Sequence, residues 1–371
     1  MYKHTNRPRA LRFRRFARTG WAAFSSMHRE VTIGRLAARV ADSSLAKCAA
    51  LCAASLLLAP ASLQAQSDKE SETRQLAEVQ IALSADSLVG SPEPAAVLTA
   101  EEISQSNLRS LADLVSLLPG VDARVRGVGD AQTDLSMRGG TFDQMVLLLN
   151  GINLTDIQAG HHTMDIPVDL SLVQRVELLT PAQLMARGIV AFCGGINIVV
   201  AEEYADRLRA EISGGSHGTA DAALLATRRA GLRSLTASAA YHRADGYRPN
   251  TDYRHGSLFL QAVRHAAGSD LHLQLGGQAK AFGSAGFYSQ AYPDQFEATR
   301  TLTASAEYTT HSPRLVTHHS LYGRLHADRF ELFRTGYAEP PAWYGGHNHH
   351  LSSTAGLRSR ALVPLGGAEL L

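Results

Sequence analysis

From residue 206 onward, apolar and polar side chains alternate along the chain. Residues two apart lie on the same face of a β-strand, so this period predicts strands with one apolar and one polar face. The pattern places strands near residues 206–215, 219–229, 233–244, 254–265, 270–281, 299–310, 314–333 and 350–362. The apolar positions in three of them are Leu235, Ala237, Ala239 and Tyr241; Leu271, Leu273 and Leu275; and Leu302, Ala304, Ala306 and Tyr308.

The connections between these strands have two different lengths. Residues 245–253 and 282–296 form long loops rich in Gly, Pro, Asn and aromatic residues, whereas residues 266–270 and 311–314 form short turns. Short turns on one side and long loops on the other are typical of an antiparallel transmembrane β-barrel. A soluble β-sandwich is the alternative, because it is also built from alternating strands. The secretory signal described below favours the barrel.

Residues 67–205 show a mixed pattern, which predicts a small α+β domain. Thr99 and Glu102 have the spacing of a capping box, in which each side chain accepts from the other residue's backbone N–H at the start of a helix. Asn150-Gly151 stands between two apolar runs and predicts a tight turn. Apolar strands are expected near residues 145–149, 173–179 and 196–200.

Charge separates the first 66 residues from the rest of the chain. They contain 11 Lys and Arg against 2 Asp and Glu, whereas the other 305 residues contain 25 against 32. Within this basic leader, an apolar run at residues 48–59 is followed by small residues ending at Ala65, which is typical of a secretory signal cleaved after that residue. A buried core helix is the alternative interpretation of the run, which is too short to span a membrane. The acidic remainder gives no basic face for nucleic acid.

Aromatic residues and histidines mark a further boundary, because 16 of 24 aromatic residues and 12 of 16 histidines follow residue 205. The chain therefore divides into four predicted parts. They are an extended leader with the signal (1–66), a flexible segment (67–81), the α+β domain (82–205) and the β-sheet portion (206–371).

No catalytic constellation emerges from the sequence, so we do not predict an enzyme. Cys193 is the one cysteine that signal cleavage would leave, and a buried, inert thiol is the default for such a residue. His161 and His162 with Asp165 are candidate metal ligands, but no further ligand lies at a helix-like spacing. Loop histidines that face a ligand or solvent are therefore the favoured interpretation, and no metal site is predicted.

Five ordered sequence blocks carry a resemblance to a known family. They are LLPGVD at 117–122, LSMRGG at 135–140, VLLLNGIN at 146–153, VQRVEL at 173–178 and GGINIV at 194–199. Together they resemble the plug of TonB-dependent receptors, which lie in the outer membrane of Gram-negative bacteria. Later motifs resemble the cobalamin (vitamin B12) transporter subgroup of that family. They are DGY at 245–247, NTD at 250–252, GFY at 286–288, RFELFR at 329–334, WY at 343–344 and HNH at 347–349.

The resemblance implies a fold and a mechanism. In this family an α+β plug blocks an antiparallel transmembrane barrel of about 22 strands. The periplasmic partner TonB transmits energy that opens a path for the bound nutrient. An apolar segment then resembles the TonB box, whereas its pattern alone leaves open a first strand of the domain or a peptide captured by strand addition. Its residues are Leu76, Ala77, Glu78, Val79, Gln80 and Ile81.

The resemblance also implies roles for individual plug residues. The loops at 126–130 and 154–164 match the apex loops that bind ligand in the family. The expected ligand-facing residues in them are Arg126, Asp130, Gln158, His161 and His162. The residues expected to be structural, in buried or barrel-facing polar contacts or in tight backbone geometry, are Arg138, Gly139, Gly140, Asn150, Gly151, Arg175 and Glu177.

The length of the chain limits how much of such a receptor it contains. Strands of about ten residues would need roughly 220 residues for 22 strands before any loop is counted. Only residues 206–371 follow the plug, so we expect the N-terminal portion of a barrel and an incomplete receptor.

The expected ligand is a cobalamin-like corrinoid, with a ferric siderophore as the alternative. TonB and outer-membrane lipid are the expected partners. A surface receptor that moves no substrate, or a non-functional fragment, is the alternative from another class. No cofactor is predicted, although Asp245 and Asp252 are residues through which calcium could order the outer loops.

Overall fold

The computed structural model describes residues 94–365 and 368–370, apart from residues 107, 109, 130, 203, 204 and 338. All of these lie in one compact unit, Glu78–Leu371. The predicted signal at 48–59, the predicted TonB box at 76–81 and Asp130 lie outside the described residues.

The first part of the described chain, residues 94–201, is the predicted α+β domain and is called the plug domain below. It contains a five-stranded sheet of order β1-β6-β7-β4-β5, in which β4 and β7 are parallel and the other neighbours antiparallel. A separate hairpin pairs β2 with β3. The strands are β1 (Ala96–Leu98), β2 (Val121–Arg126), β3 (Gln132–Met137), β4 (Met145–Leu149), β5 (Ile152–Asn153), β6 (Val173–Leu179) and β7 (Gly194–Val200). The helices are α2 (Ala100–Gln105), α3 (Leu111–Ser116) and α4 (Pro181–Ala186), with 3-10 turns η2 (Phe142–Gln144), η3 (Gly160–His162) and η4 (Leu170–Leu172).

Local sequence explains how these elements start and how they pack. Thr99 Oγ1 accepts from Glu102 N at 3.3 Å, and Glu102 Oε2 accepts from Thr99 N at 2.7 Å, so the predicted capping box is confirmed at the start of α2. Leu114 of α3 is fully buried in the same hydrophobic cluster as Leu147 of β4 and Ile196 of β7. The amphipathic face of α3 therefore closes the core of the plug domain over its sheet.

The predicted turn at Asn150-Gly151 is confirmed between β4 and β5. Asn150 has φ 50° and Gly151 has φ 77°, and two consecutive positive φ angles are what a type I′ hairpin turn requires. Asn150 Oδ1 also accepts from Val200 N at 2.9 Å, and Gly151 N donates to Asn197 Oδ1 at 2.8 Å. These bonds attach the turn to β7.

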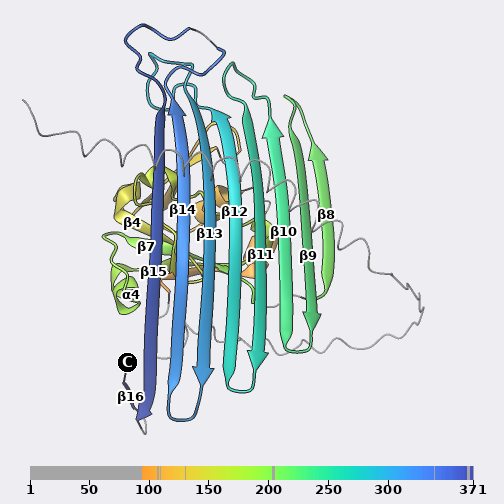
Figure 1. The fold of residues 1–371 in the computed structure, drawn as a ribbon, viewed down its shortest axis with the longest axis vertical. Helices are drawn as coiled ribbons and strands as arrows, with labels where there is room; N and C mark the ends of the chain where they lie inside the picture. Colours follow the sequence, from red (N-terminus) through yellow and green to blue (C-terminus); the bar gives the residue numbers. More distant parts are fainter. Residues whose placement is uncertain are drawn as a thin grey trace, which may run out of the picture. The chain divides into compact units, whose positions relative to one another are not determined.

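The rest of the chain forms one nine-stranded sheet, called the wall sheet below. Each strand pairs antiparallel with its neighbours in sequence, from β8 at one edge to β16 at the other (Figure 1). The eight predicted strands are all present, and 314–333 is one strand. The short β16 was not predicted. The strands are β8 (Arg207–Gly214), β9 (Ala220–Ala230), β10 (Arg233–Ala244), β11 (Tyr253–Ala266), β12 (Ser269–Gly283), β13 (Phe296–His311), β14 (Val316–Glu331), β15 (Asn348–Leu365) and β16 (Ala368–Leu370).

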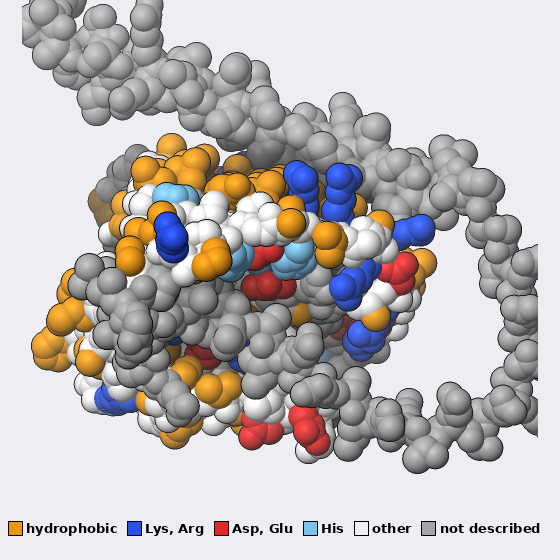
Figure 2. Space-filling model, turned by 90° about the horizontal axis from the view of Figure 1, so that it is seen from below, with side chains coloured by type: hydrophobic (Ala, Val, Ile, Leu, Met, Phe, Trp, Pro, Cys, Tyr) orange, Lys and Arg blue, Asp and Glu red, His pale blue; other side chains and the backbone are white. Residues whose placement is uncertain are grey.

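The two faces of the wall sheet have the reverse of the usual polarity. Leu235, Leu302 and Leu325 are about half exposed, whereas Thr236 and Thr301 on the opposite face are almost fully buried. Figure 2 shows hydrophobic side chains along the outer side of the wall sheet and histidines and acidic side chains on its inner side. An outward apolar face with an inward polar face suits a strand that crosses lipid.

The inner face of the wall sheet packs against the plug domain, where β4, β7 and α4 lie (Figure 1). Gln261 Nε2 of β11 donates to the Ala201 carbonyl at 2.7 Å, and Arg360 Nη2 of β15 donates to the Arg187 carbonyl at 3.2 Å. A β-sandwich would instead cover this face with a second sheet. The fold is therefore a plug domain against a barrel wall, as predicted. None of the described helices is long and apolar enough to cross a membrane.

Candidate functional site

Three plug residues meet at the end of the β2–β3 hairpin and are called the apex cluster below. Arg126 Nη2 lies 2.8 Å from Asp134 Oδ2, and His161 Nδ1 lies 2.6 Å from Asp134 Oδ1. Burial would raise the pKa of Asp134, but His161 and Arg126 outweigh this effect and hold that pKa below its ordinary value. The Arg126 and His161 side chains remain 24% and 26% exposed. A buried carboxylate thus holds two donor groups at the edge of solvent.

The long loop between β12 and β13 contacts the apex cluster. Arg126 Nη1 donates to the Phe287 carbonyl at 2.5 Å, and the Tyr288 hydroxyl donates to Glu297 Oε2 at 2.9 Å. The His161 ring lies 4.4 Å from Phe142 and 5.9 Å from Tyr288, measured between ring centroids. The apex of the plug domain therefore faces the long-loop end of the wall sheet. A cation, an imidazole and aromatic faces together suit a large ligand with polar or anionic groups.

The other predicted ligand-facing residues lie in different places. Gln158 is exposed, and its backbone N–H donates to Asp156 Oδ1 at 2.8 Å. His162 is a correction, because its side chain is only 7% exposed and points to the wall sheet, with Nε2 3.3 Å from Glu297 Oε1. The turn η3 explains the difference, since it turns adjacent residues in different directions: His161 stays at the apex and His162 is buried.

Two of the predicted structural residues form a buried polar network. Arg175 Nε donates to Glu177 Oε1 at 2.7 Å, and Asn197 Nδ2 donates to Glu177 Oε2 at 2.9 Å. Asn197 also accepts from Gly151 N, so the network joins β6, β7 and the turn after β4. Partners on both carboxylate oxygens are what a buried charge requires. The sequence analysis did not identify Asn197, although it lies in the GGINIV block.

The segment 138–140 makes the tight backbone geometry that its glycines predicted. Arg138 has φ 49° and Gly139 has φ 80°, and Arg138 N donates to the Gly120 carbonyl at 3.0 Å. The Arg138 side chain is exposed, so the buried or barrel-facing contact expected for it is not found among the described residues. Its backbone is held in the turn and its side chain is left in solvent. A Cβ on Gly140 would lie 1.9 Å from Cys193 Sγ.

Substituting Gly140 by alanine is expected to lower the free energy of unfolding by about 1–3 kcal/mol, because the added methyl overpacks the space beside Cys193. The double variant G140A/C193A should recover most of that loss, since it removes the sulfur. Urea unfolding in detergent, followed by circular dichroism, measures both. The control G214A meets its nearest atom at 3.6 Å and should stay within about 0.5 kcal/mol of the unsubstituted chain. Equal losses in G140A and G214A would contradict the overpacking argument.

Buried ion pairs connect the loop at 154–165 with the wall sheet. Arg324 of β14 pairs with Asp156, and its Nη2 donates to the His162 carbonyl at 3.3 Å. Ser352 Oγ of β15 donates to Asp156 Oδ2 at 3.2 Å. Burial would raise the pKa of Asp156, but the charge and hydrogen bond of Arg324 lower it to about 2. Lys280 Nζ of β12 lies 2.9 Å from Asp165 Oδ1.

The two acidic loop residues considered for calcium are paired with arginines. Both carboxylate oxygens of Asp252 accept from Arg334, at 2.5 and 2.9 Å. This hydrogen bonding and the charge of Arg334 hold the pKa of Asp252 below its ordinary value. Asp245 Oδ1 accepts from Arg243 Nη2 at 2.7 Å. The guanidinium of Arg334 therefore neutralises the charge of Asp252 in this geometry.

Comparison with known proteins agrees with this architecture. Residues 87–190 match the family described as TonB-dependent Receptor Plug Domain. The matched residues therefore carry the plug domain of the TonB-dependent receptors. Four of the five sequence blocks lie within the matched residues, so the predicted resemblance is confirmed, and with it the outer-membrane location that this family has.

Relatives extend the match beyond the plug. The receptor is 30% identical over 127 residues to the "Vitamin B12 transporter BtuB" of Photobacterium profundum, covering 34% of this chain and 20% of that protein. Its fold is similar to the FrpB iron transporter from Neisseria meningitidis (TM-score 0.58, 13% identity, 73% of this chain and 46% of that chain). It is also similar to the ferric citrate transporter FecA in its unliganded form (TM-score 0.56, 14% identity, 74% and 45%). The chain thus spans about a fifth of the curated relative and under half of these solved structures.

Sequence reasoning missed the receptor's contacts between plug and wall. Lys280, Arg324 and Ser352 stand on the polar face of predicted strands, and that pattern marks them as inward-facing. The alternation of polar and apolar positions does not predict which plug residues these three side chains contact.

Proposed function

We propose that the chain supplies the plug and the first barrel strands of a receptor that imports a large, scarce nutrient, a cobalamin-like corrinoid, with energy from TonB. The apex cluster carries this proposal. It places Arg126 and His161, held by Asp134, beside Tyr288 of a long loop, and these groups stay partly open to solvent. Polar donors next to aromatic faces at the mouth of a plugged barrel suit a ligand too large to diffuse through a pore.

The choice of a corrinoid rests on two supports. A curated relative is a vitamin B12 transporter, and the motif at 286–288 lies in the loop that contacts the apex cluster. The motifs at 245–252 lie in the loop between β10 and β11. A ferric siderophore is the second candidate, because such chelates are commonly anionic and Arg126 is a strong partner for carboxylate or catecholate oxygens. Calorimetry decides between the two ligands. The receptor in detergent is titrated with cyanocobalamin and, separately, with ferric chelates. If a heat of binding is observed with ferric chelates but not with cyanocobalamin, the corrinoid proposal is wrong.

Replacing Arg126 by methionine is expected to weaken binding of the preferred ligand by about 10- to 30-fold, because a partly desolvated arginine is typical of binding hot spots. Arg124 provides a matched control, since it lies on the same strand and is exposed. R124M should change the dissociation constant less than twofold. If R126M and R124M bind ligand equally well, the apex cluster is not the binding site.

A receptor that binds ligand without moving it remains the alternative of another class. Transport requires a coupling segment, and residues 76–81 are our candidate for the strand that TonB captures by β-augmentation. Uptake of radiolabelled ligand, measured beside surface binding, separates the two functions. Binding without uptake in a TonB-containing host would favour the non-transporting receptor.

A further inference from the structure

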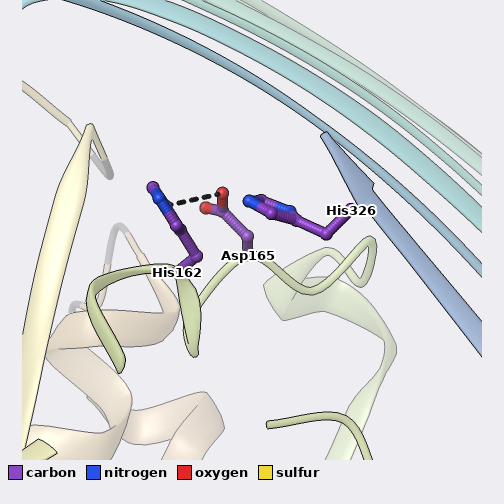
Figure 3. Close-up of side chains that lie close together, drawn as sticks. All are labelled: His162, Asp165 and His326. Atoms are coloured by element: carbon purple, nitrogen blue, oxygen red, sulfur yellow. Dashed lines mark ion pairs between the residues drawn. The ribbon is translucent and has the colours of Figure 1, made fainter. Parts of the chain in front are cut away.

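Three metal-ligating side chains converge between the plug domain and the wall sheet, below the apex cluster. His162 and Asp165 come from η3 and the residues after it, and His326 comes from β14 (Figure 3). One ligand atom from each lies within 4.8 Å of the other two. All three residues are buried, with exposures of 6%, 5% and 1%. His162 and Asp165 are three residues apart, but His326 lies on a distant strand, so the fold is needed to bring the third ligand to them.

Two of the converging atoms lack hydrogen-bond partners. His326 Nε2 and Asp165 Oδ2 are buried and make no hydrogen bond among the described residues. Buried polar atoms are normally satisfied, and an orphaned one costs free energy. Figure 3 shows the Asp165 carboxylate beside the two imidazole rings, with the dashed line marking the 3.8 Å approach of His162 Nδ1 to Asp165 Oδ2. A cation at this point would satisfy both orphaned atoms.

Neighbouring residues orient the free atoms toward the shared space. Thr301 is the register partner of His326 on β13, and its Oγ1 lies 2.8 Å from His326 Nδ1. With the proton on Nδ1, the ring donates to Thr301 and Nε2 presents its lone pair. Lys280 Nζ holds Asp165 Oδ1 at 2.9 Å and leaves Oδ2 for a further partner. Such outer contacts are what fix the ligands of protein metal sites.

The local charge favours a divalent cation. Four buried carboxylates, Asp156, Asp165, Glu297 and Asp328, stand around His162 and His326, against the two cationic side chains Lys280 and Arg324. With the imidazoles neutral, the formal charge of this group is −2. An ion of charge +2 would balance it.

We propose that His162, Asp165 and His326 bind a divalent transition-metal ion of the zinc class, which fastens the plug loop to the wall sheet. Two imidazole nitrogens and one carboxylate oxygen suit such an ion, whereas calcium and magnesium prefer oxygen ligands. Tetrahedral ligands about 2.05 Å from zinc stand about 3.3 Å apart. His162 Nδ1 and Asp165 Oδ2 are 3.8 Å apart and all three ligand atoms lie within 4.8 Å of one another, so metal binding requires the side chains to close by about 0.5–1.5 Å. The site is independent of the imported nutrient.

A second group of candidate ligands shares His162 and is less suitable. One ligand atom from each of His162, Glu297 and Asp328 also lies within 4.8 Å of the other two. Each carboxylate has an oxygen that is already engaged, because Glu297 Oε2 accepts from the Tyr288 hydroxyl and Asp328 Oδ2 lies 2.9 Å from His350 Nδ1. His326 and Asp165 retain free ligand atoms, so they form the favoured pair with His162.

Zinc binding to the full chain tests the proposal. The chain is purified in detergent, stripped with EDTA and titrated with ZnCl2 by calorimetry, and Co²⁺ is added separately for its visible absorption. We expect one equivalent of Zn²⁺ and an intense four-coordinate cobalt spectrum. H326Q should weaken zinc binding by at least tenfold and remove the spectrum. H350Q, a matched change outside the three ligands, should leave both unchanged.

Several outcomes would overturn the assignment. The proposal is wrong if the unsubstituted chain shows no saturable zinc binding. It is also wrong if H326Q and D165N both bind zinc as tightly as the unsubstituted chain does. Loss of binding in D328N but not in H326Q would overturn it too, because it would move the ion to the second group. Circular dichroism verifies that each variant keeps its sheet. D165N serves as the second ligand variant if H326Q does not fold.

Discussion

Replacing Arg324 by methionine is expected to lower the free energy of unfolding by about 3–5 kcal/mol, because it leaves the buried Asp156 carboxylate without its counter-charge. The Arg324 and Asp156 side chains are 2% and 0% exposed. The same substitution also removes the donor to the His162 carbonyl. Urea unfolding of the chain in detergent, monitored by circular dichroism, measures the loss.

Two further variants separate this effect from a general loss of charge. Arg209 pairs with Glu211 on β8, but its side chain is 43% exposed, so R209M should cost less than about 1 kcal/mol. The double variant D156L/R324M removes both charges and should recover much of the stability lost in R324M. If R324M is no less stable than R209M, the pair does not hold the plug loop to the wall.

Deleting residues 76–81 is expected to reduce ligand uptake to the background of a strain without the receptor, while ligand binding stays unchanged. The reason is that a captured strand would transmit force only through its own backbone hydrogen bonds, which a deletion removes entirely. Uptake of labelled ligand by whole cells measures the first effect, and calorimetry on purified receptor measures the second.

A deletion of equal length gives the control for this experiment. Residues 68–73 lie in the polar stretch before the candidate coupling segment. Removing them shortens the same linker without touching the apolar positions, so uptake should remain near that of the unaltered receptor. Full uptake after deletion of 76–81 would rule out its role as the TonB box.

The sequence predicted most of the secondary structure because its determinants are local. The capping box at Thr99 and Glu102 and the turn at Asn150-Gly151 depend on residues within three positions of each other. The wall strands depend on a period of two that persists through each strand. A single sheet of consecutive antiparallel strands needs no further information, since every strand pairs with its neighbours in the chain.

The expected role of the apex residues in ligand binding stays a prediction. Arg126 and His161 were expected to face ligand, and their side chains are partly exposed at the apex. His162 differs from its neighbour only in the direction that η3 gives its side chain, and neither composition nor spacing specifies that direction. Its environment also depends on Glu297 and His326, which lie on two different strands.

The sequence by itself determined the division into leader, plug and wall, the alternation of the strands and the family resemblance. Only the tertiary structure decided which charges meet across the interface between plug and wall. Asp156 and Arg324, for example, stand 168 positions apart in the chain. A local pattern shows that a side chain faces inward. Its partner depends on how far one domain is turned and shifted against the other, and that is set by the packing of the whole interface.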